Sequence, residues 1–364
     1  MSKDNWDIQF IKPCRLPDDE HLQLTAQYSI NAMARGRLVQ INLDNCSIQR
    51  MEDLSQSATL DDVEAVGLLP LYHLLHHGRV ALSAIGIHEM PDRKVEGARR
   101  AYYRFCKKFW PGHVDDHEAT SRAFDPHATA AKVRFSDLED GSRTVYGSAY
   151  VAMLQIQNIK LSYPGLAPEE QFRIYLHSMI HLLNIVSAFE LEIAKYAFWA
   201  LSKSQINNLE PAIKQRRKDI RENFAKVGTD LDKCRNIAFD AALDLHWLSG
   251  ANLAQDAGAD IEIGGKRFLL DNWVGTNDHK LYRINRDIHS TFFGGSTMKM
   301  LVTAREEALE RLPYWQAVDS FARETLRYRA AHGHPGVTDL LMRIDSAVQH
   351  LEQEIHKART VSPA

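Results

Sequence analysis

The sequence predicts an α/β protein with a central parallel sheet, split by a large helical insertion and followed by C-terminal helices. Two strand-like apolar segments, residues 38–43 and 268–276, support the sheet. Between them, from about residue 92 to residue 235, the pattern is mainly helical. Helices are expected there at 98–110, 168–199 and 211–224.

Composition sets limits on the class of protein. The 364 residues exceed the usual size of a single core, and 45% hydrophobic with 25% charged residues is typical of a globular chain. The formal net charge of −3 predicts no generally basic surface. Four scattered cysteines exclude a zinc ribbon or a disulfide framework and favour a reducing cytoplasm. The sequence begins with no secretory signal and has no membrane-spanning run, so no membrane partner is expected.

Local signals indicate the elements in the first part of the chain. Residues 1–36 are treated as a short N-terminal segment, and the strand at 38–43 follows. Thr59 is suited to cap a helix, and a helix at 68–77 tolerates Pro70 in its first turn and stops at Gly78. The apolar run 80–87 fits a strand or a buried helix equally well, and it leads to Glu89.

The later part alternates less regularly. Residues 136–144 are expected to form a loop, and 163–165 a turn. An amphipathic helix is expected at 236–253, a loop or hairpin at 258–267 and a strand at 268–276. After Asp278 the chain is expected to be helical, with a break at 333–336.

Both predicted strands end in an acid. Asp44 follows the first strand and Asp278 follows the second. Ligands of an open parallel sheet gather beyond the carboxyl ends of its strands, so these carboxylates are expected to face one another there. Clustered acids repel unless a cation lies between them, which indicates a metal site.

The acids resemble the catalytic set of PIN-like nucleases. Glu89 follows Asp44 at the family's spacing, and Thr276-Asn277-Asp278 followed by Leu281 is similar to the closing motif. The helix opening at 235–240 supplies the third acid, for which Asp240 is favoured, with Asp244 one turn later as a neighbour. The resemblance divides the chain into an N-terminal segment (1–36), two parts of a PIN-like core (37–92 and 235–290), a helical insertion (93–234) and a helical C-terminal region (291–364).

The resemblance implies a divalent-metal-dependent ribonuclease, acting as a toxin, in phage defence or in RNA processing. Hard Mg²⁺ or Mn²⁺ ions prefer oxygen ligands, and a metal-bound water is a usable nucleophile. RNA is the expected partner in preference to DNA. The insertion is a candidate docking surface for an inhibitory or sensor protein, and a homo-oligomer is left open. The residues implied as catalytic or metal-binding are Asp44, Glu89, Asp240, Asp244 and Asp278, and those implied as substrate-binding are Asn45, Thr276, Asn277 and Lys280.

Two basic clusters border the proposed acids and are candidates for phosphate binding. The alternative is a mixed, solvated helix face, because acids alternate with the first cluster. The first cluster is Lys214, Arg216, Arg217, Lys218, Arg221, Lys226, Lys233 and Arg235, and the second is Arg99, Arg100, Arg104, Lys107 and Lys108.

Other interpretations remain open at this stage. Asp44 also fits a turn or a helix cap, Asp278 fits an ordinary turn, and the remaining acids fit solvated positions, as in a non-catalytic helical scaffold protein. His177 and His181, four residues apart, fit a metal hydrolase completed by Glu190 and Glu192. Ser178, however, replaces the acid of the zinc-protease motif. No phosphate-binding loop or serine-nucleophile elbow is present in the sequence.

Overall fold

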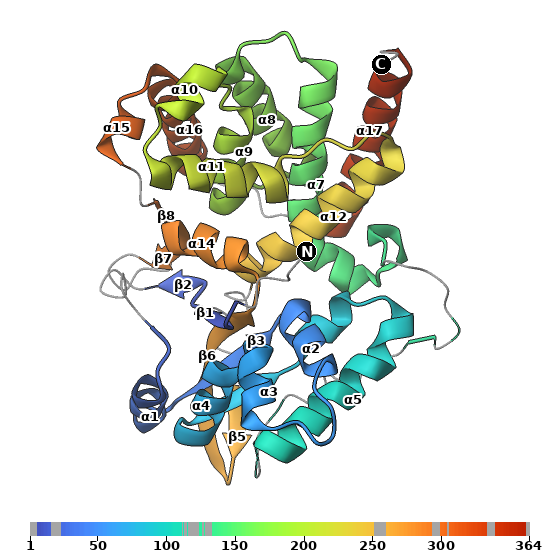
Figure 1. The fold of residues 1–364 in the computed structure, drawn as a ribbon. Helices are drawn as coiled ribbons and strands as arrows, with labels where there is room; N and C mark the ends of the chain where they lie inside the picture. Colours follow the sequence, from blue (N-terminus) through green and yellow to red (C-terminus); the bar gives the residue numbers. More distant parts are fainter. Residues whose placement is uncertain are drawn as a thin grey trace. The chain divides into compact units, whose positions relative to one another are not determined.

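The chain forms two compact units, which are described separately (Figure 1). The structure is a computed structural model that describes residues 6–15, 23–110, 112, 115, 124–125, 127, 133–250, 260–292, 299–303, 306–332 and 339–361. Unit 1 comprises residues 1–133 and 247–299, and unit 2 comprises residues 134–246 and 300–364.

Unit 1 contains a five-stranded sheet among its described residues. The strand order is β1 (Gln9–Ile11), β6 (Lys266–Thr276), β3 (Arg37–Leu43) and β4 (Val80–Ser83), and β5 (Asp260–Ile263) pairs with β6. Strand β3 is parallel to β4 and β6, whereas β1 and β5 are antiparallel to β6. The sheet is therefore mixed, and the expectation of a parallel sheet is correct only for β6, β3 and β4.

Two segments make the sheet mixed. The N-terminal residues, expected to stand apart, supply the edge strand β1. Strands β5 and β6 form the hairpin allowed for in residues 258–267, and they turn at Gly264 and Gly265, whose φ angles of 57° and 74° suit glycine. Along β3, Val39, Ile41 and Leu43 are completely buried, which fits a central strand covered on its faces.

The helices of unit 1 follow the local sequence signals. Thr59 forms a capping box with Asp62, helix α4 carries proline in its first turn, and Gly78 caps its end, as predicted. The ambiguous run 80–87 divides into β4 and a short 3₁₀ helix. The helices are α1 (Ala26–Ala34), α2 (Asn45–Glu52), α3 (Leu60–Ala65), α4 (Leu69–His77), the 3₁₀ helix η2 (Ile85–Glu89), α5 (Asp92–Phe109) and α14 (His279–Asp287).

Unit 2 is helical. Its buried helix α7 (Asp140–Ser162) packs against α8 (Pro168–Leu183), α9 (Ala188–Phe198), α12 (Leu231–Leu245) and α17 (Leu340–Val361). The remaining helices are η3 (Phe135–Asp137), α10 (Lys203–Asn207), α11 (Pro211–Phe224), α15 (Glu307–Glu310) and α16 (Pro313–His332). At the end of α12 the chain continues as a π-helical turn, η4 (His246–Gly250).

Three expectations about helices need correction. The predicted loop at 136–144 gives way to α7 from Asp140 onward, because the apolar residues that follow bury a long helix. The single helix expected at 168–199 is broken at Asn184, which adopts φ 55° and caps α8. The chain after Asp278 is not wholly helical, since it contains β7 (Ile288–Phe292), parallel to β2 (Cys14–Arg15), and β8 (Lys299–Thr303).

The observed division of the chain differs from the predicted one. Helix α5 belongs to unit 1, so the helical region begins at residue 134 rather than at 93, and it includes α12. The predicted break at 333–336 lies outside the described residues. None of the helices described here has the length and apolar character that crossing a membrane requires.

Candidate active site

The carboxyl ends of β3 and β6 lie side by side, as the sequence predicts. Leu43 pairs with Gly275, and the Asp44 amide donates a hydrogen bond to the Gly275 carbonyl at 3.1 Å. The Thr276 hydroxyl donates to Asp44 Oδ2. Asp44 and the Thr276-Asn277-Asp278 turn, distant in sequence, therefore share one edge of the sheet, which we call the acid edge together with Asn45 and Glu89.

Asp44 is 4% exposed and serves as the N-cap of α2. Its Oδ1 accepts a hydrogen bond from the Ser47 amide at 2.9 Å. Burial raises the pKa of Asp44 to about 6, against the lowering effect of the Thr276 and Ser47 hydrogen bonds, and the negative charge of Asp278 raises it further. The two carboxylates are thus close enough to repel one another.

Asp278 is half-buried and caps the next helix, α14. Its Oδ1 accepts hydrogen bonds from the amides of Lys280 at 2.7 Å and Leu281 at 3.0 Å. Its Oδ2 accepts no hydrogen bond from the part of the chain that the structure describes. The helix-cap interpretation of Asp44 is therefore confirmed, and Asp278 proves to be a helix cap as well. Each carboxylate keeps lone pairs that can bind a further ligand, and in Asp278 these include both lone pairs of Oδ2.

Glu89 reaches the same edge through η2, which follows β4. Its Oε2 accepts a hydrogen bond from Asn45 Nδ2 at 3.2 Å. Helix η2 can approach this closely because residue 86 is glycine. A Cβ atom there would lie 2.5 Å from the Asp44 carbonyl carbon and 2.6 Å from the Asn45 nitrogen.

Asn277 holds the Thr276-Asn277-Asp278 turn in place through its side-chain hydrogen bonds. It is 9% exposed, its Oδ1 accepts a hydrogen bond from the Ser47 hydroxyl at 2.9 Å, and its Nδ2 donates to the Trp6 carbonyl at 2.9 Å. The sequence did not single out Ser47 or Trp6. Ser47 is the third residue of the helix that Asp44 caps, and this position was the only sequence signal for it. The role of Trp6 depends on the position of β1.

Asp240 and Asp244 belong to α12 of unit 2. Asp240 is exposed and Asp244 is half-buried. The acid edge of unit 1 therefore brings together three of the predicted acids, Asp44, Glu89 and Asp278, and not these two.

The acid edge offers a cation only a small number of carboxylate ligands. Within the described ranges, no three His, Cys, Asp or Glu side chains gather closely enough to hold a metal ion among themselves. Mg²⁺, however, commonly binds through one or two carboxylates and keeps waters in its other positions. Asp44 and Asp278, whose negative charges repel one another, supply the two carboxylates that such a site needs.

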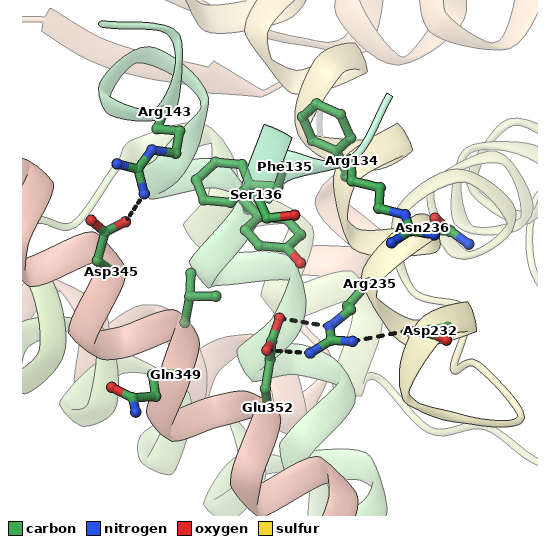
Figure 2. Close-up of a pocket in the computed structure, with 13 residues that line it drawn as sticks. Arg134, Phe135, Ser136, Arg143, Asp232, Arg235, Asn236, Asp345, Gln349 and Glu352 are labelled. Atoms are coloured by element: carbon green, nitrogen blue, oxygen red, sulfur yellow. Dashed lines mark hydrogen bonds and ion pairs between the residues drawn. The ribbon is translucent and has the colours of Figure 1, made fainter. Parts of the chain in front are cut away.

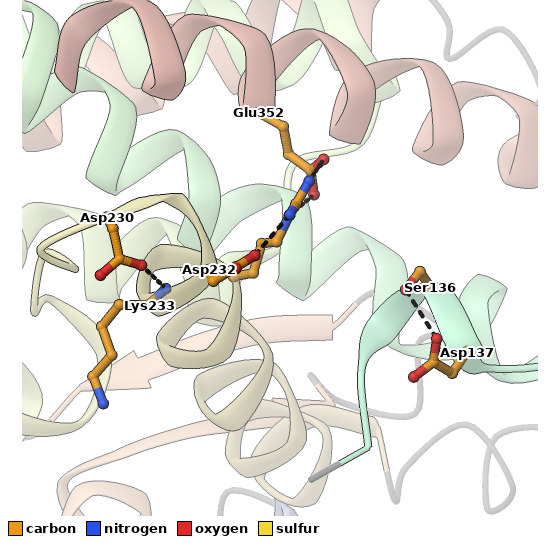
Figure 3. A network of polar contacts seen from close by, with 7 residues as sticks. Ser136, Asp137, Asp230, Asp232, Lys233 and Glu352 are labelled. Atoms are coloured by element: carbon orange, nitrogen blue, oxygen red, sulfur yellow. Dashed lines mark hydrogen bonds and ion pairs between the residues drawn. The ribbon is translucent and has the colours of Figure 1, made fainter. Parts of the chain in front are cut away.

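The arginines of the first basic cluster make contacts within unit 2, whereas its lysines are exposed. Arg235 binds Glu352 of α17 through two hydrogen bonds at 2.8 and 2.6 Å, and it binds Asp232 at 2.9 Å (Figure 2). The nearby Asp230 caps α12 through the Lys233 amide at 2.8 Å (Figure 3). Arg235, Asp232 and Glu352 line a cavity of about 630 Å³ between α7, α12 and α17.

Other members of this cluster also have internal partners. Arg216 is 6% exposed and pairs with Glu306 through two bonds of 3.1 Å. Arg217 and Arg221 donate to the Trp199 and Ala197 carbonyls at the end of α9. The expectation that this cluster binds phosphate is not supported for these arginines, which stabilise helix ends and an ion pair.

The second cluster, on α5, contacts the far end of α2. Arg104 donates to the Met51 carbonyl at 3.4 Å, and Lys108 donates to the Gln56 carbonyl at 2.8 Å. Met51 lies near the last residue of α2, whereas Asp44 caps its first turn. These two side chains therefore face away from the acid edge.

The structure separates the residues of the histidine-based alternative. His177 and His181 are exposed on α8, and His177 packs edge-on against Phe321. Glu190 and Glu192 are 4% and 0% exposed within α9. Glu192 pairs instead with Lys195 at 3.1 Å.

Unit 1 also contains a buried charge pair that the sequence did not indicate. Lys12 pairs with Asp271 of β6 and lies 5.2 Å from the centre of the Trp273 ring. The Tyr28 hydroxyl donates to the second Asp271 oxygen at 2.7 Å. The pair thus joins α1 and the β1 end of the chain to β6.

Comparison with known proteins gives no relative: no family model, no curated protein and no solved structure matches this chain.

Proposed function

We propose that the acid edge of unit 1 is the active site of a divalent-metal-dependent ribonuclease with a PIN-like core. The observation that carries the proposal is the link through Thr276, whose hydroxyl donates to Asp44 and accepts from the Asp278 amide at the ends of the neighbouring parallel strands β3 and β6. Ligands bind at this edge of such sheets, and a phosphodiesterase needs carboxylates there to hold a cation.

Each residue of the edge has a place in this proposal. Asp44 and Asp278 hold the metal, and Thr276 and Ser47 orient the Asp44 carboxylate. Glu89, oriented by Asn45, accepts a hydrogen bond from the attacking water. Asn277 fixes the turn, and Lys280, half-buried two residues after Asp278, is placed to attract a phosphate.

A bound Mg²⁺ or Mn²⁺ supplies a deprotonated water and neutralises charge on the phosphate. The protein contributes the rest. Two helix caps hold the acids rigidly, because each carboxylate is fixed by backbone amides of the following helix. Such preorganisation means that the carboxylates need no rearrangement when substrate arrives.

Asp240, with Asp244 beside it, stays a prediction of the resemblance. A toxin, phage-defence or RNA-processing role is equally a prediction. The proposal itself depends only on the acids of unit 1.

The proposal is tested by RNA cleavage with and without Mg²⁺ or Mn²⁺. We expect Asp44→Asn and Asp278→Asn to lower the rate by about two orders of magnitude or more, since each removes a ligand charge. Asparagine is also a good helix cap, so the fold should persist. Asp61→Asn, an exposed acid in the first turn of α3, is the matched control. Wild-type cleavage by both asparagine variants would contradict the proposal.

A further inference from the structure

Trp6 is the exposed tryptophan of this protein, and it lies beside the acid edge. The chain has six tryptophans, and Trp6 is 48% exposed, whereas the next most exposed, Trp110, reaches 7%. Isolated exposed apolar residues are common, so exposure alone indicates no function. The position and the neighbours of Trp6 carry the inference.

Trp6 is held in place by the residues of the candidate site. Its carbonyl accepts a hydrogen bond from Asn277 Nδ2 at 2.9 Å. Gly67, with φ 75°, lies directly against it, and a Cβ atom at that position would be 2.4 Å from the Trp6 oxygen. The next turn of chain is fixed as well, because the Ile8 amide donates to the Gly67 carbonyl at 2.7 Å.

The indole ring packs against His279, the residue that follows Asp278. The ring centres are 4.0 Å apart and the planes are inclined by 31°. The pairing of β1 with β6 brings the two chain segments together, since Gln9 lies opposite Thr276, and Trp6 and His279 each lie three residues beyond these paired strand ends. Histidine thus supports one side of the indole, and nearly half of the residue stays open to solvent.

Unit 1 also holds a groove of about 440 Å³, and Trp6 and His279 lie near its lining residues in the sequence without lining it themselves. It is lined by Asp7, next to Trp6, and by Tyr282, one helical turn after His279 on the same face of α14. Aromatic, imidazole and amide side chains also line it, among them Phe10, His73, His77 and Gln9, together with apolar side chains such as Ile8, Leu24 and Leu74. These are the side-chain types that stack on bases and bond their edges.

We propose that Trp6, supported by His279, is a base-stacking platform for an unpaired nucleobase, with the groove lined by Tyr282 and Phe10 taking the adjoining nucleotide. This inference rests on the proposed function, which places a phosphodiester at Asp278. Stacking requires an open base face, so the platform selects single-stranded over double-stranded segments at the acid edge.

Tryptophan fluorescence tests the proposal in the full chain. A single-stranded RNA of about ten nucleotides, added in EDTA so that no cleavage occurs, should quench the emission of Trp6 saturably. A duplex of the same sequence should not. Trp6→Ala should weaken binding about tenfold, measured by anisotropy of a labelled strand, because one base stack is lost. Trp6→Phe should keep most of the affinity while the quenching disappears.

Tyr163→Ala is the matched control, since Tyr163 is an exposed aromatic residue, at 45%, of unit 2. Unchanged binding by Trp6→Ala, or equal quenching by duplex, would overturn the platform. The two proposals fail separately. If RNA quenches Trp6 but is not cleaved with any metal, the nuclease proposal is rejected and the platform is kept. If RNA is cleaved but Trp6→Ala binds it as the wild type does, the platform is rejected and the nuclease proposal is kept.

Discussion

The Thr276 hydroxyl donates a hydrogen bond to the carboxylate of Asp44, a residue 232 positions earlier in the chain. The same hydroxyl oxygen accepts a hydrogen bond from the Asp278 amide at 2.8 Å. Thr276 therefore links the two acids of the edge directly, and all three positions depend on the pairing of β3 with β6.

Replacing this hydroxyl should loosen the edge. Thr276→Val keeps the shape of a completely buried side chain but leaves Asp44 Oδ2 without its donor. We expect a loss of about 1–3 kcal/mol in the free energy of unfolding, measured in urea. Thr276→Ser keeps the hydroxyl and should lose less. Equal stability of the valine variant and the wild type would show that the bond is unimportant.

The close approach of η2 to α2 predicts a steric effect at Gly86. Gly86→Ala places a methyl group within 2.6 Å of the backbone of Asp44 and Asn45. We expect destabilisation by about 1–3 kcal/mol and slower RNA cleavage, because Glu89 is displaced with η2. Gly141→Ala, in α7 with no atom within 4 Å of the added Cβ, should be neutral or slightly stabilising. Thermal unfolding of both variants separates these outcomes.

The buried arginine of the first basic cluster should matter for stability and not for RNA. Arg216→Ala leaves Glu306 without its bidentate partner, so we expect unit 2 to lose about 3 kcal/mol. Lys214→Ala, an exposed neighbour in the same helix, should change neither stability nor RNA affinity. Weaker RNA binding by a folded Arg216→Lys variant would instead restore the phosphate-binding interpretation.

Glu190 should make unit 2 less stable as the pH rises. Burial raises its pKa from 4.5 to about 7, so between these values the folded protein holds a proton that the unfolded chain has released. Its stabilising contribution is complete below about pH 4.5 and is lost as the pH passes about 7. Glu190→Gln cannot titrate there, so its melting temperature should fall less over this range. Parallel pH profiles of the two proteins would refute this assignment.

Local signals predicted much of the fold because they act within a few residues. The Thr59 capping box, the proline in the first turn of α4 and the Gly78 stop are all properties of adjacent residues, and each prediction is confirmed. The apolar runs that end at Asp44 and Thr276 likewise predicted two strands whose ends meet.

Features that depend on distant contacts were missed. Strand β1 is three residues long, and it exists because β6 offers an edge for pairing. Trp6 acquires its partner through that pairing, and Ser47 acquires its partner through the pairing of β3 with β6. The basic clusters misled for the same reason, since sequence shows charge but not the carbonyl or carboxylate that Arg216 or Arg104 meets in the fold.

The central claim is that Asp44 and Asp278 hold a divalent cation, and Mn²⁺ binding measured by electron paramagnetic resonance tests it most directly. We expect the wild type and Asp61→Asn to bind Mn²⁺ equally, and Asp278→Asn to bind it about tenfold or more weakly, because a ligand carboxylate is lost. Equal Mn²⁺ affinity of the wild type and Asp278→Asn, or no binding by the wild type, would contradict the claim.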